Sequence, residues 1–157
     1  MVALANLPAN PSSIHQFGRA ARTQMDAARH QLADALAVSV HDIIFTSGGT
    51  EANNLVLGNY RHIITSAVEH DAVLAACPDA QIIDVDENGL IRLDQLQAML
   101  EALPDTDKAQ TLVSVMAANN ETGVVQPIEA VADMCCAYNV ACHSDMIQFL
   151  GKAPINL

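Results

Sequence analysis

Short apolar runs that alternate with helix-like segments constrain the fold more than any other feature of this sequence. The runs are hydrophobic at successive positions, which is typical of strands covered on both faces. They occupy residues 42–46, 62–65, 81–85, 111–116 and 140–144, and the helices expected between them span 51–57, 69–76, 93–103 and 127–138. This alternation predicts an α/β fold in three layers, with a mostly parallel sheet and helices on both faces.

The N-terminal part of the chain carries one long helical pattern. Residues 1–11 contain two prolines and are expected to form a lead-in segment. Ser13 and Gln16 then have the spacing of a capping box. The apolar residues from there on recur every three or four positions and predict an amphipathic helix: Ile14, Phe17, Ala21, Met25, Ala28, Leu32 and Leu36. The length of 157 residues fits one domain, which we expect over 12–157.

The charge of the chain disfavours two classes of partner. Its net charge is −11, and it has seven lysine and arginine residues without a clustered basic face. Nucleic acids and anionic membrane surfaces bind such clusters, so we expect neither as a partner. No apolar run approaches the ~20 residues of a membrane span. The N-terminus does not resemble a signal peptide, and we therefore expect a cytoplasmic protein.

The four cysteines are Cys77, Cys135, Cys136 and Cys142. A chain of this length without a secretion signal is not expected to rely on a disulfide framework. A zinc site that combines Cys142 with His143 is disfavoured, because neighbours on a strand point to opposite faces. We expect reduced thiols and no bound metal.

Polar residues follow the ends of several predicted strands, where ligands of parallel sheets bind. Gly49 and Thr50 lie between a strand and a helix, and backbone N–H groups and a hydroxyl there favour an anion such as phosphate. A glycine turn that only relieves steric crowding explains the same residues.

Three further strand ends carry candidate ligands. His70 follows the second strand, Asn120 follows the fourth, and Asp145 ends the fifth with Gln148 three residues later. A helix start, a turn and a helix cap are the plainer explanations. Together with the phosphate-binding turn, these side chains form a set that suits pyridoxal 5′-phosphate. That cofactor needs a group over its ring, an anion at its pyridine nitrogen and a donor to its phenolic oxygen.

Several segments of the sequence also resemble one family. They are Asn10-Pro11-Ser12-Ser13-Ile14-His15, Phe45-Thr46-Ser47-Gly48-Gly49-Thr50-Glu51, His62-Ile63-Ile64-Thr65-Ser66 with Glu69-His70, and Asn119-Asn120-Glu121-Thr122-Gly123. From about Asn10 to Leu157 the chain resembles the NifS/IscS-like cysteine desulfurases, which are class V aminotransferases. The resemblance implies part of the large domain of a type I pyridoxal-phosphate-dependent transferase. It also implies a homodimer that converts L-cysteine to L-alanine with transfer of sulfur, as in iron–sulfur cluster assembly.

The resemblance further implies a role for each candidate residue. The implied cofactor-binding residues are Gly49, Thr50, His70, Asn120, Asp145 and Gln148. The first two would hold the phosphate. His70 would stack on the ring and assist proton transfer as the catalytic residue, and Asn120 would lie near the phenolic oxygen and the substrate carboxylate. Asp145 would pair with the pyridine nitrogen, and Gln148 would bond the phenolic oxygen.

The sequence departs from the family pattern in two respects. The family's Ser-x-His-Lys motif, with its Schiff-base lysine, and its persulfide-forming cysteine have no match here. We therefore expect an internal piece of the large domain that is inactive by itself. The family usually has a small residue directly after the aspartate, where this chain has Met146; Met146 and Ile147 are both bulky beside the expected ring and would crowd or tilt the cofactor.

Three alternatives to a partial desulfurase remain. In the first, the chain is a non-catalytic gene fragment or interaction module. In the second, it is one half of a split enzyme that a C-terminal polypeptide completes. In the third, it is a relative with selenocysteine lyase or aminotransferase activity.

Overall fold

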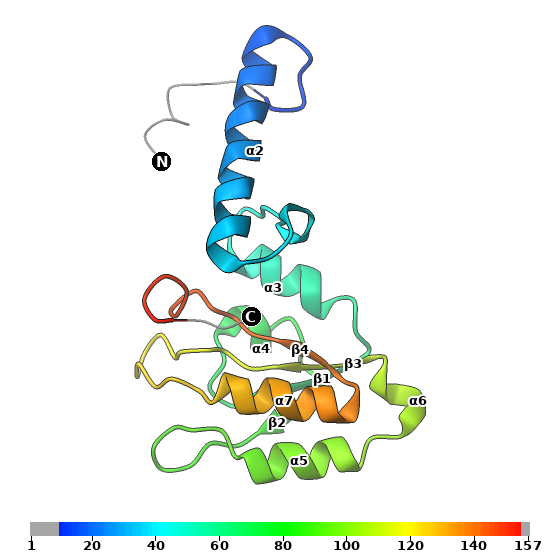
Figure 1. Ribbon diagram of the computed structural model, residues 1–157. Coiled ribbons are helices and arrows are strands. Elements are labelled where there is room, and N and C mark those ends of the chain that lie inside the picture. The colour runs from blue at the N-terminus through cyan, green and yellow to red at the C-terminus, as the bar shows by residue number, and fades with distance from the viewer. Residues whose placement is uncertain (1–9, 155–157) are drawn as a thin grey trace. The chain divides into compact units, whose positions relative to one another are not determined.

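The computed structural model describes residues 10–154, so the predicted lead-in over 1–11 lies almost wholly outside the described residues. The described chain forms two compact units, one ending at Phe45 and the other beginning at Thr46. Both are drawn in Figure 1, and each is described by itself. The expectation of a single domain over 12–157 stays a prediction.

Helix α2, Gln16–Leu36, forms most of the first unit. Its cap differs from the predicted one, because the side chain of His15 accepts the N–H of Gly18 at 3.2 Å. Ser13 instead donates its N–H to Asn10 in a turn, so the chain becomes helical only afterwards. A Cβ at Gly18 would collide with the carbonyl oxygen of Ser13, which explains a glycine in the first turn of the helix.

The predicted strand over 42–46 is wrong. The short 3₁₀ helix η1, Val40–Asp42, occupies its start, and residues 43–46 have no regular structure. Ser39 and Asp42 form a reciprocal capping box that favours this helical turn. Among the residues that the structure describes, the run pairs with no strand, and with Ile44 70% exposed it buries little surface.

The second unit contains a four-stranded parallel sheet in the order β2-β1-β3-β4. The strands are β1 His62–Ser66, β2 Gln81–Ile83, β3 Thr111–Ser114 and β4 Ala141–His143. The helices are α3 Gly49–Leu57, α4 Asp71–Leu74, α5 Leu93–Glu101, α6 Asp105–Lys108 and α7 Ile128–Tyr138. Four of the five predicted strands are therefore confirmed, and the one-turn helix α6 was not predicted.

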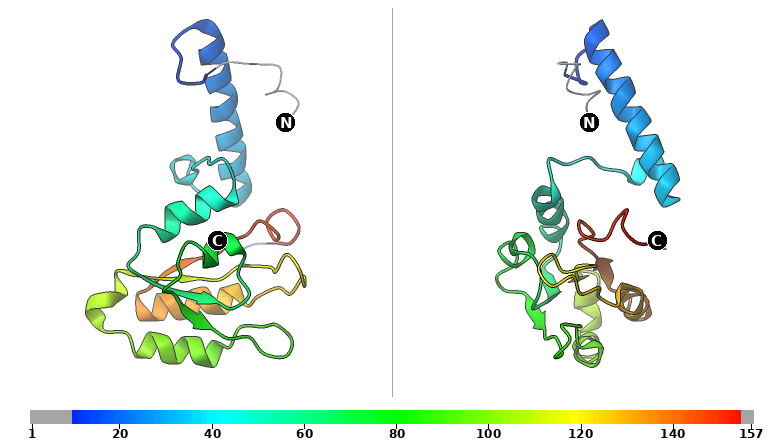
Figure 2. Two further views of the ribbon diagram at one scale, coloured as in Figure 1. Left: turned by 180° about the vertical axis from the view of Figure 1, so that it is seen from behind. Right: turned by 90° about the vertical axis from the view of Figure 1, so that its left-hand side faces the viewer.

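Helices cover both faces of this sheet, as Figures 1 and 2 show. Ile64 and Val113 point to the face where α5 and α7 pack, and they join a buried cluster with Leu96 and Val131. Their strand neighbours Ile63 and Leu112 point to the opposite face. That face is covered by α3 and α4 through a second cluster that contains Leu57 and Val73. The alternation of side chains along each strand thus produces the predicted three layers.

Strand β1 lies in the middle of the sheet, with its residues from Ile63 to Ser66 buried. All four residues of β3 are buried as well. Because these strands are parallel, their carboxyl ends meet at one edge, where the polar loops after them converge. No helix among the described residues is long and apolar enough to cross a membrane.

Candidate functional site

A pocket of about 200 Å³ opens at the carboxyl edge of the sheet. All six predicted site residues line it: Gly49, Thr50, His70, Asn120, Asp145 and Gln148. They come from the start of α3 and from the loops that follow β1, β3 and β4. The topology thus brings together residues that are up to about a hundred positions apart in the sequence. Their roles toward a ligand stay predictions.

The start of α3 forms one end of the pocket. The helix begins at Gly49, two residues earlier than predicted, and its N-cap Gly48 makes no side-chain cap. The N-terminus of a helix of this length carries N–H groups that suit an anion, and the Thr50 hydroxyl lies beside them. A Cβ at Gly48 would meet open space, whereas one at Gly49 would collide with Ile147.

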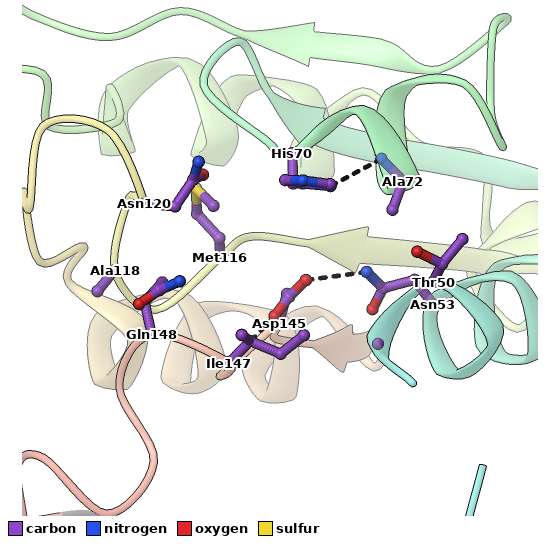
Figure 3. Close-up of a pocket in the computed structure, with 11 residues that line it drawn as sticks. Thr50, Asn53, His70, Ala72, Met116, Ala118, Asn120, Asp145, Ile147 and Gln148 are labelled. Carbon is purple, nitrogen blue, oxygen red and sulfur yellow. Dashed lines mark hydrogen bonds between the residues drawn. The ribbon is translucent and has the colours of Figure 1, made fainter. Parts of the chain in front are cut away.

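His70 lies across the pocket from Asp145 and Ile147 in Figure 3. It is also the N-cap of α4, because its Nδ1 accepts the N–H of Ala72 at 3.0 Å. The histidine therefore stands at a helix start, as one explanation has it, and its role toward a ligand stays a prediction. In the neutral ring, an accepting Nδ1 places the proton on Nε2. The capping bond thereby fixes the orientation of the ring and its tautomer.

The loop after β3 is held by Asn119, which the sequence did not single out. Its Oδ1 accepts the N–H groups of Glu121 and Thr122 at 2.9 and 2.8 Å. Its Nδ2 donates to the carbonyl of Val68 at 2.9 Å, two residues before His70. Asn119 thus positions both its neighbour Asn120 and the loop that carries the histidine. In the sequence, Asn119 belongs to the Asn119-Asn120-Glu121-Thr122-Gly123 segment that resembles the family, but no role was implied for it.

Asp145 is held from two directions. Its Oδ1 accepts the N–H of Ile147 at 3.0 Å, and its Oδ2 accepts the side-chain Nδ2 of Asn53 at 2.9 Å. Asn53 is 3% exposed and was not among the predicted residues. Gln148, further along the same loop, accepts Nζ of Lys152 at 2.8 Å.

A buried acid, Glu69, lies directly before His70. Its Oε1 accepts Oγ of Ser66 at 2.5 Å and the N–H of Met116 at 2.8 Å, so it joins the ends of β1 and β3. Its Oε2 is buried without a hydrogen-bond partner among the described residues. Burial raises the pKa of Glu69 to about 7, and the charge of Asp145 adds to the rise.

The cysteines lie away from the pocket. Cys135 is buried on α7, while Cys136 and Cys142 are exposed. A hydrogen bond with Cys142 raises the pKa of Cys135 and lowers that of Cys142. Within residues 10–154, no group of three or more His, Cys, Asp or Glu side chains is placed to hold a metal ion.

The fold and this pocket define a three-layer α/β domain with a polar binding site at the carboxyl ends of parallel strands. The family model for "Aminotransferase class-V" matches residues 3–157. The chain belongs to this family, and its expected relation to cysteine desulfurases is confirmed by the similarities that follow.

Two curated relatives and one solved structure illustrate the similarity. The chain is 42% identical to a putative cysteine desulfurase IscS 1 of Bacillus subtilis (strain 168), with 94% of this chain and 41% of the relative covered. It is 38% identical to the cysteine desulfurase IscS of Dictyoglomus turgidum, with 94% and 40% covered. The NifS-like protein from Rickettsia africae ESF-5 matches with a TM-score of 0.90 and 36% identity, over 99% of this chain and 45% of that chain.

The matches confirm the expected fold class, which is that of part of the large domain of NifS-like type I transferases. The chain spans about two fifths of the length of the curated relatives that it matches.

Proposed function

We propose that this chain binds pyridoxal 5′-phosphate non-covalently and contributes the cofactor-binding part of a cysteine desulfurase-like enzyme. The observation that carries the proposal is the convergence of three strand ends and the start of α3 on one pocket that contains all six predicted ligands. Members of the family use this cofactor, and L-cysteine is the substrate named by the relatives' activity. When bound, the cofactor supplies an electron sink for bonds at the α-carbon of an amino acid.

The donor set fits the chemical groups of the cofactor. The N-terminus of α3 and the Thr50 hydroxyl suit a phosphate at one end of the pocket. The Asp145 carboxylate suits a protonated pyridine nitrogen, because an anion beside that nitrogen keeps its proton in place. Asn120 and Gln148 offer amide donors to an oxygen substituent of the ring. Open space at Gly48 leaves room for the phosphate to approach the backbone.

His70 and Ile147 bound the pocket from opposite sides. The flat imidazole suits stacking on a ring, and its Nε2 is the atom that remains free to move a proton, since Nδ1 is used by the cap of α4. Ile147 is a bulky residue that lines the pocket and lies close to its Gly49 end. We therefore expect Ile147 to limit how deeply the cofactor enters, so that binding is weak.

Turnover is proposed to need groups that the 157 residues do not supply. The sequence has two lysines, Lys108 and Lys152, and neither stands in a Ser-x-His-Lys motif. None of its four cysteines lines the pocket. A nucleophilic thiol and a lysine amine are both required for covalent chemistry on cysteine. We propose that a complementing C-terminal polypeptide provides them and that the chain alone is inactive.

Self-association is a further part of the proposal. Ile14, just before α2, and Phe17, in its first turn, are 88% and 66% exposed, and apolar side chains of this size favour an interface. We propose a homodimer in the cytoplasm, without nucleic acid or membrane as a partner.

The test combines binding with turnover. The purified chain is dialysed against pyridoxal phosphate to measure binding, and is then incubated with L-cysteine while sulfide and alanine are assayed. Dialysable cofactor, without sulfide or alanine, is the expected result. Selenocysteine and an amino-group acceptor, supplied in parallel, distinguish a lyase or an aminotransferase once the complementing polypeptide is added. Absence of cofactor binding would instead favour an interaction module, and robust turnover by the chain alone would contradict the account.

A further inference from the structure

Asn53 lies at the edge of the pocket and connects two parts of it. Its side chain is 3% exposed, and its Nδ2 donates to Oδ2 of Asp145 at 2.9 Å across 92 positions of sequence (Figure 3). Residues three or four apart share a helix face, so Asn53 follows Gly49 and Thr50 by one turn on the same face of α3. One partly buried hydrogen bond therefore joins the anion-binding end of α3 to the loop after β4.

The two oxygens of Asp145 are held in different ways. Oδ1 accepts the N–H of Ile147 at 3.0 Å, a bond within its own loop. Oδ2 accepts Asn53, a bond to a separate element. A carboxylate has about four acceptor positions, so each oxygen keeps the capacity to accept another donor from the pocket. Only the Asn53 bond fixes the carboxylate relative to the helix that would hold the phosphate.

We propose that Asn53 is a positioning residue of the cofactor site. Its amide orients the Asp145 carboxylate toward the pyridine nitrogen and sets the spacing between that carboxylate and the phosphate-binding start of α3. The inference rests on the proposed function, because it takes the cofactor to be the ligand of this pocket. A ring that is held at its phosphate and at its nitrogen needs both ends of the site at one fixed separation, and a small misplacement weakens binding.

The first test uses the chain without cofactor. A double-mutant cycle with Asn53→Ala, Asp145→Ala and the double variant measures the coupling between the two residues by urea unfolding. Asn54→Ala is the matched control, since this exposed neighbour donates to the carbonyl of Thr50 within its own helix. We expect the losses of stability caused by Asn53→Ala and Asp145→Ala to be non-additive. Those caused by Asn54→Ala and Asp145→Ala should add. Additive effects for Asn53 would overturn the proposal.

The second test measures the cofactor itself. Pyridoxal phosphate labelled with ¹⁵N in its ring is titrated into the wild type, Asn53→Ala, Asn53→Ser and Asn54→Ala. Loss of a hydrogen bond to a charged group predicts a dissociation constant raised about tenfold for Asn53→Ala. The ring ¹⁵N signal should also move toward the unprotonated form. Asn53→Ser retains a donor and should lie between Asn53→Ala and the wild type, whereas Asn54→Ala should match the wild type.

The two tests separate the failure of this inference from failure of the proposed function. If Asn53→Ala binds the labelled cofactor with wild-type affinity and an unchanged ring signal, the positioning role is wrong while the proposed function stands. If the wild type binds no cofactor, the proposed function and the cofactor role of Asn53 are both wrong. The double-mutant cycle then still decides whether Asn53 holds Asp145.

Discussion

Replacing Glu69 by glutamine should change how the stability of this protein depends on pH. Glu69 is 7% exposed, and burial raises its pKa from the ordinary value of 4.5 to about 7 even though Ser66 and Met116 donate hydrogen bonds to it. Unfolding returns the carboxyl to water. Between these two pKa values the folded chain therefore holds a proton that the unfolded chain releases. The stability of the wild type should fall as the pH rises through this window.

The size of the effect follows from the pKa of Glu69. A change of one pKa unit corresponds to about 1.4 kcal/mol. A pKa of about 7 in the folded chain, in place of 4.5, therefore costs about 3 kcal/mol once Glu69 is fully ionised. Glutamine keeps an oxygen for the bonds from Ser66 and Met116 and has no proton to release. Glu69→Gln should then be close to the wild type near pH ~4 and more stable by up to about 3 kcal/mol above pH ~7.5.

Urea unfolding followed by circular dichroism, repeated between about pH 4 and pH 8, measures this difference. Burial lowers the pKa of His143, which gives the wild type an opposing pH dependence, but this contribution is common to both proteins and cancels when they are compared. Glu87→Gln, at an exposed loop position, is the matched control for the loss of one carboxylate, and the effect of Glu69→Gln is read against it. A difference between Glu69→Gln and the wild type that stays constant with pH would refute the reasoning.

Three further predictions concern the pocket, the first helix and the core. Ile147→Ala should enlarge the pocket and tighten binding of pyridoxal phosphate in equilibrium dialysis. Leu150→Ala changes a residue outside the pocket and should leave this binding unchanged. Weaker binding by Ile147→Ala would contradict the prediction and show that the isoleucine supports the ligand. Gly18→Ala should destabilise the start of α2 by roughly 1–3 kcal/mol, because the new Cβ would collide with the carbonyl oxygen of Ser13. Circular dichroism measures the resulting loss of helix content, and an unchanged spectrum would contradict the prediction. Leu100→Ala should cost roughly 2–5 kcal/mol in urea unfolding, since this side chain is fully buried, whereas a similar cost for the exposed Leu90→Ala would argue against the assigned core.

Most of the second unit could be predicted from the sequence, because each of its strands lies in a short local run of apolar residues. The runs that contain β1 and β3 are apolar at successive positions, and these two central strands are buried on both faces, as such runs require. The run over 42–46 looks the same locally but has no pairing partner, and Ile44 remains exposed. Whether a run pairs depends on its neighbours in space, which a local pattern does not contain.

Four of the predicted site residues lie in loops that follow a strand, namely His70, Asn120, Asp145 and Gln148, whereas Gly49 and Thr50 lie at the start of α3. Parallel topology then brings them together in the pocket without further information. Asn53 and the raised pKa of Glu69 could not be found in this way. Asn53 lies inside a helix pattern, and its partner Asp145 is 92 positions away. Glu69 owes its raised pKa to burial between two strand ends, which depends on tertiary packing.

The residue that caps α2 could not be predicted from local spacing either. The spacing of Ser13 and Gln16 matches a capping box, yet His15 caps the helix because a turn closed by Asn10 delays its start. Several neighbouring residues can cap the same helix, and the geometry of the preceding turn determines which of them forms the capping hydrogen bond. His70 is the second histidine that caps a helix here, and there the cap and the proposed ligand role use different atoms of the ring.

The central claim is that this pocket binds pyridoxal phosphate, and amide chemical shifts test it most directly. The ¹⁵N-labelled chain is titrated with the cofactor, with inorganic phosphate as a control, while the ¹H–¹⁵N spectrum is recorded. The account predicts that the largest shifts fall on the backbone amides of Gly49, Thr50, Asn120 and Ile147, and that Asp145→Ala reduces the affinity. Shifts confined to other parts of the chain, or none at millimolar cofactor, would contradict it.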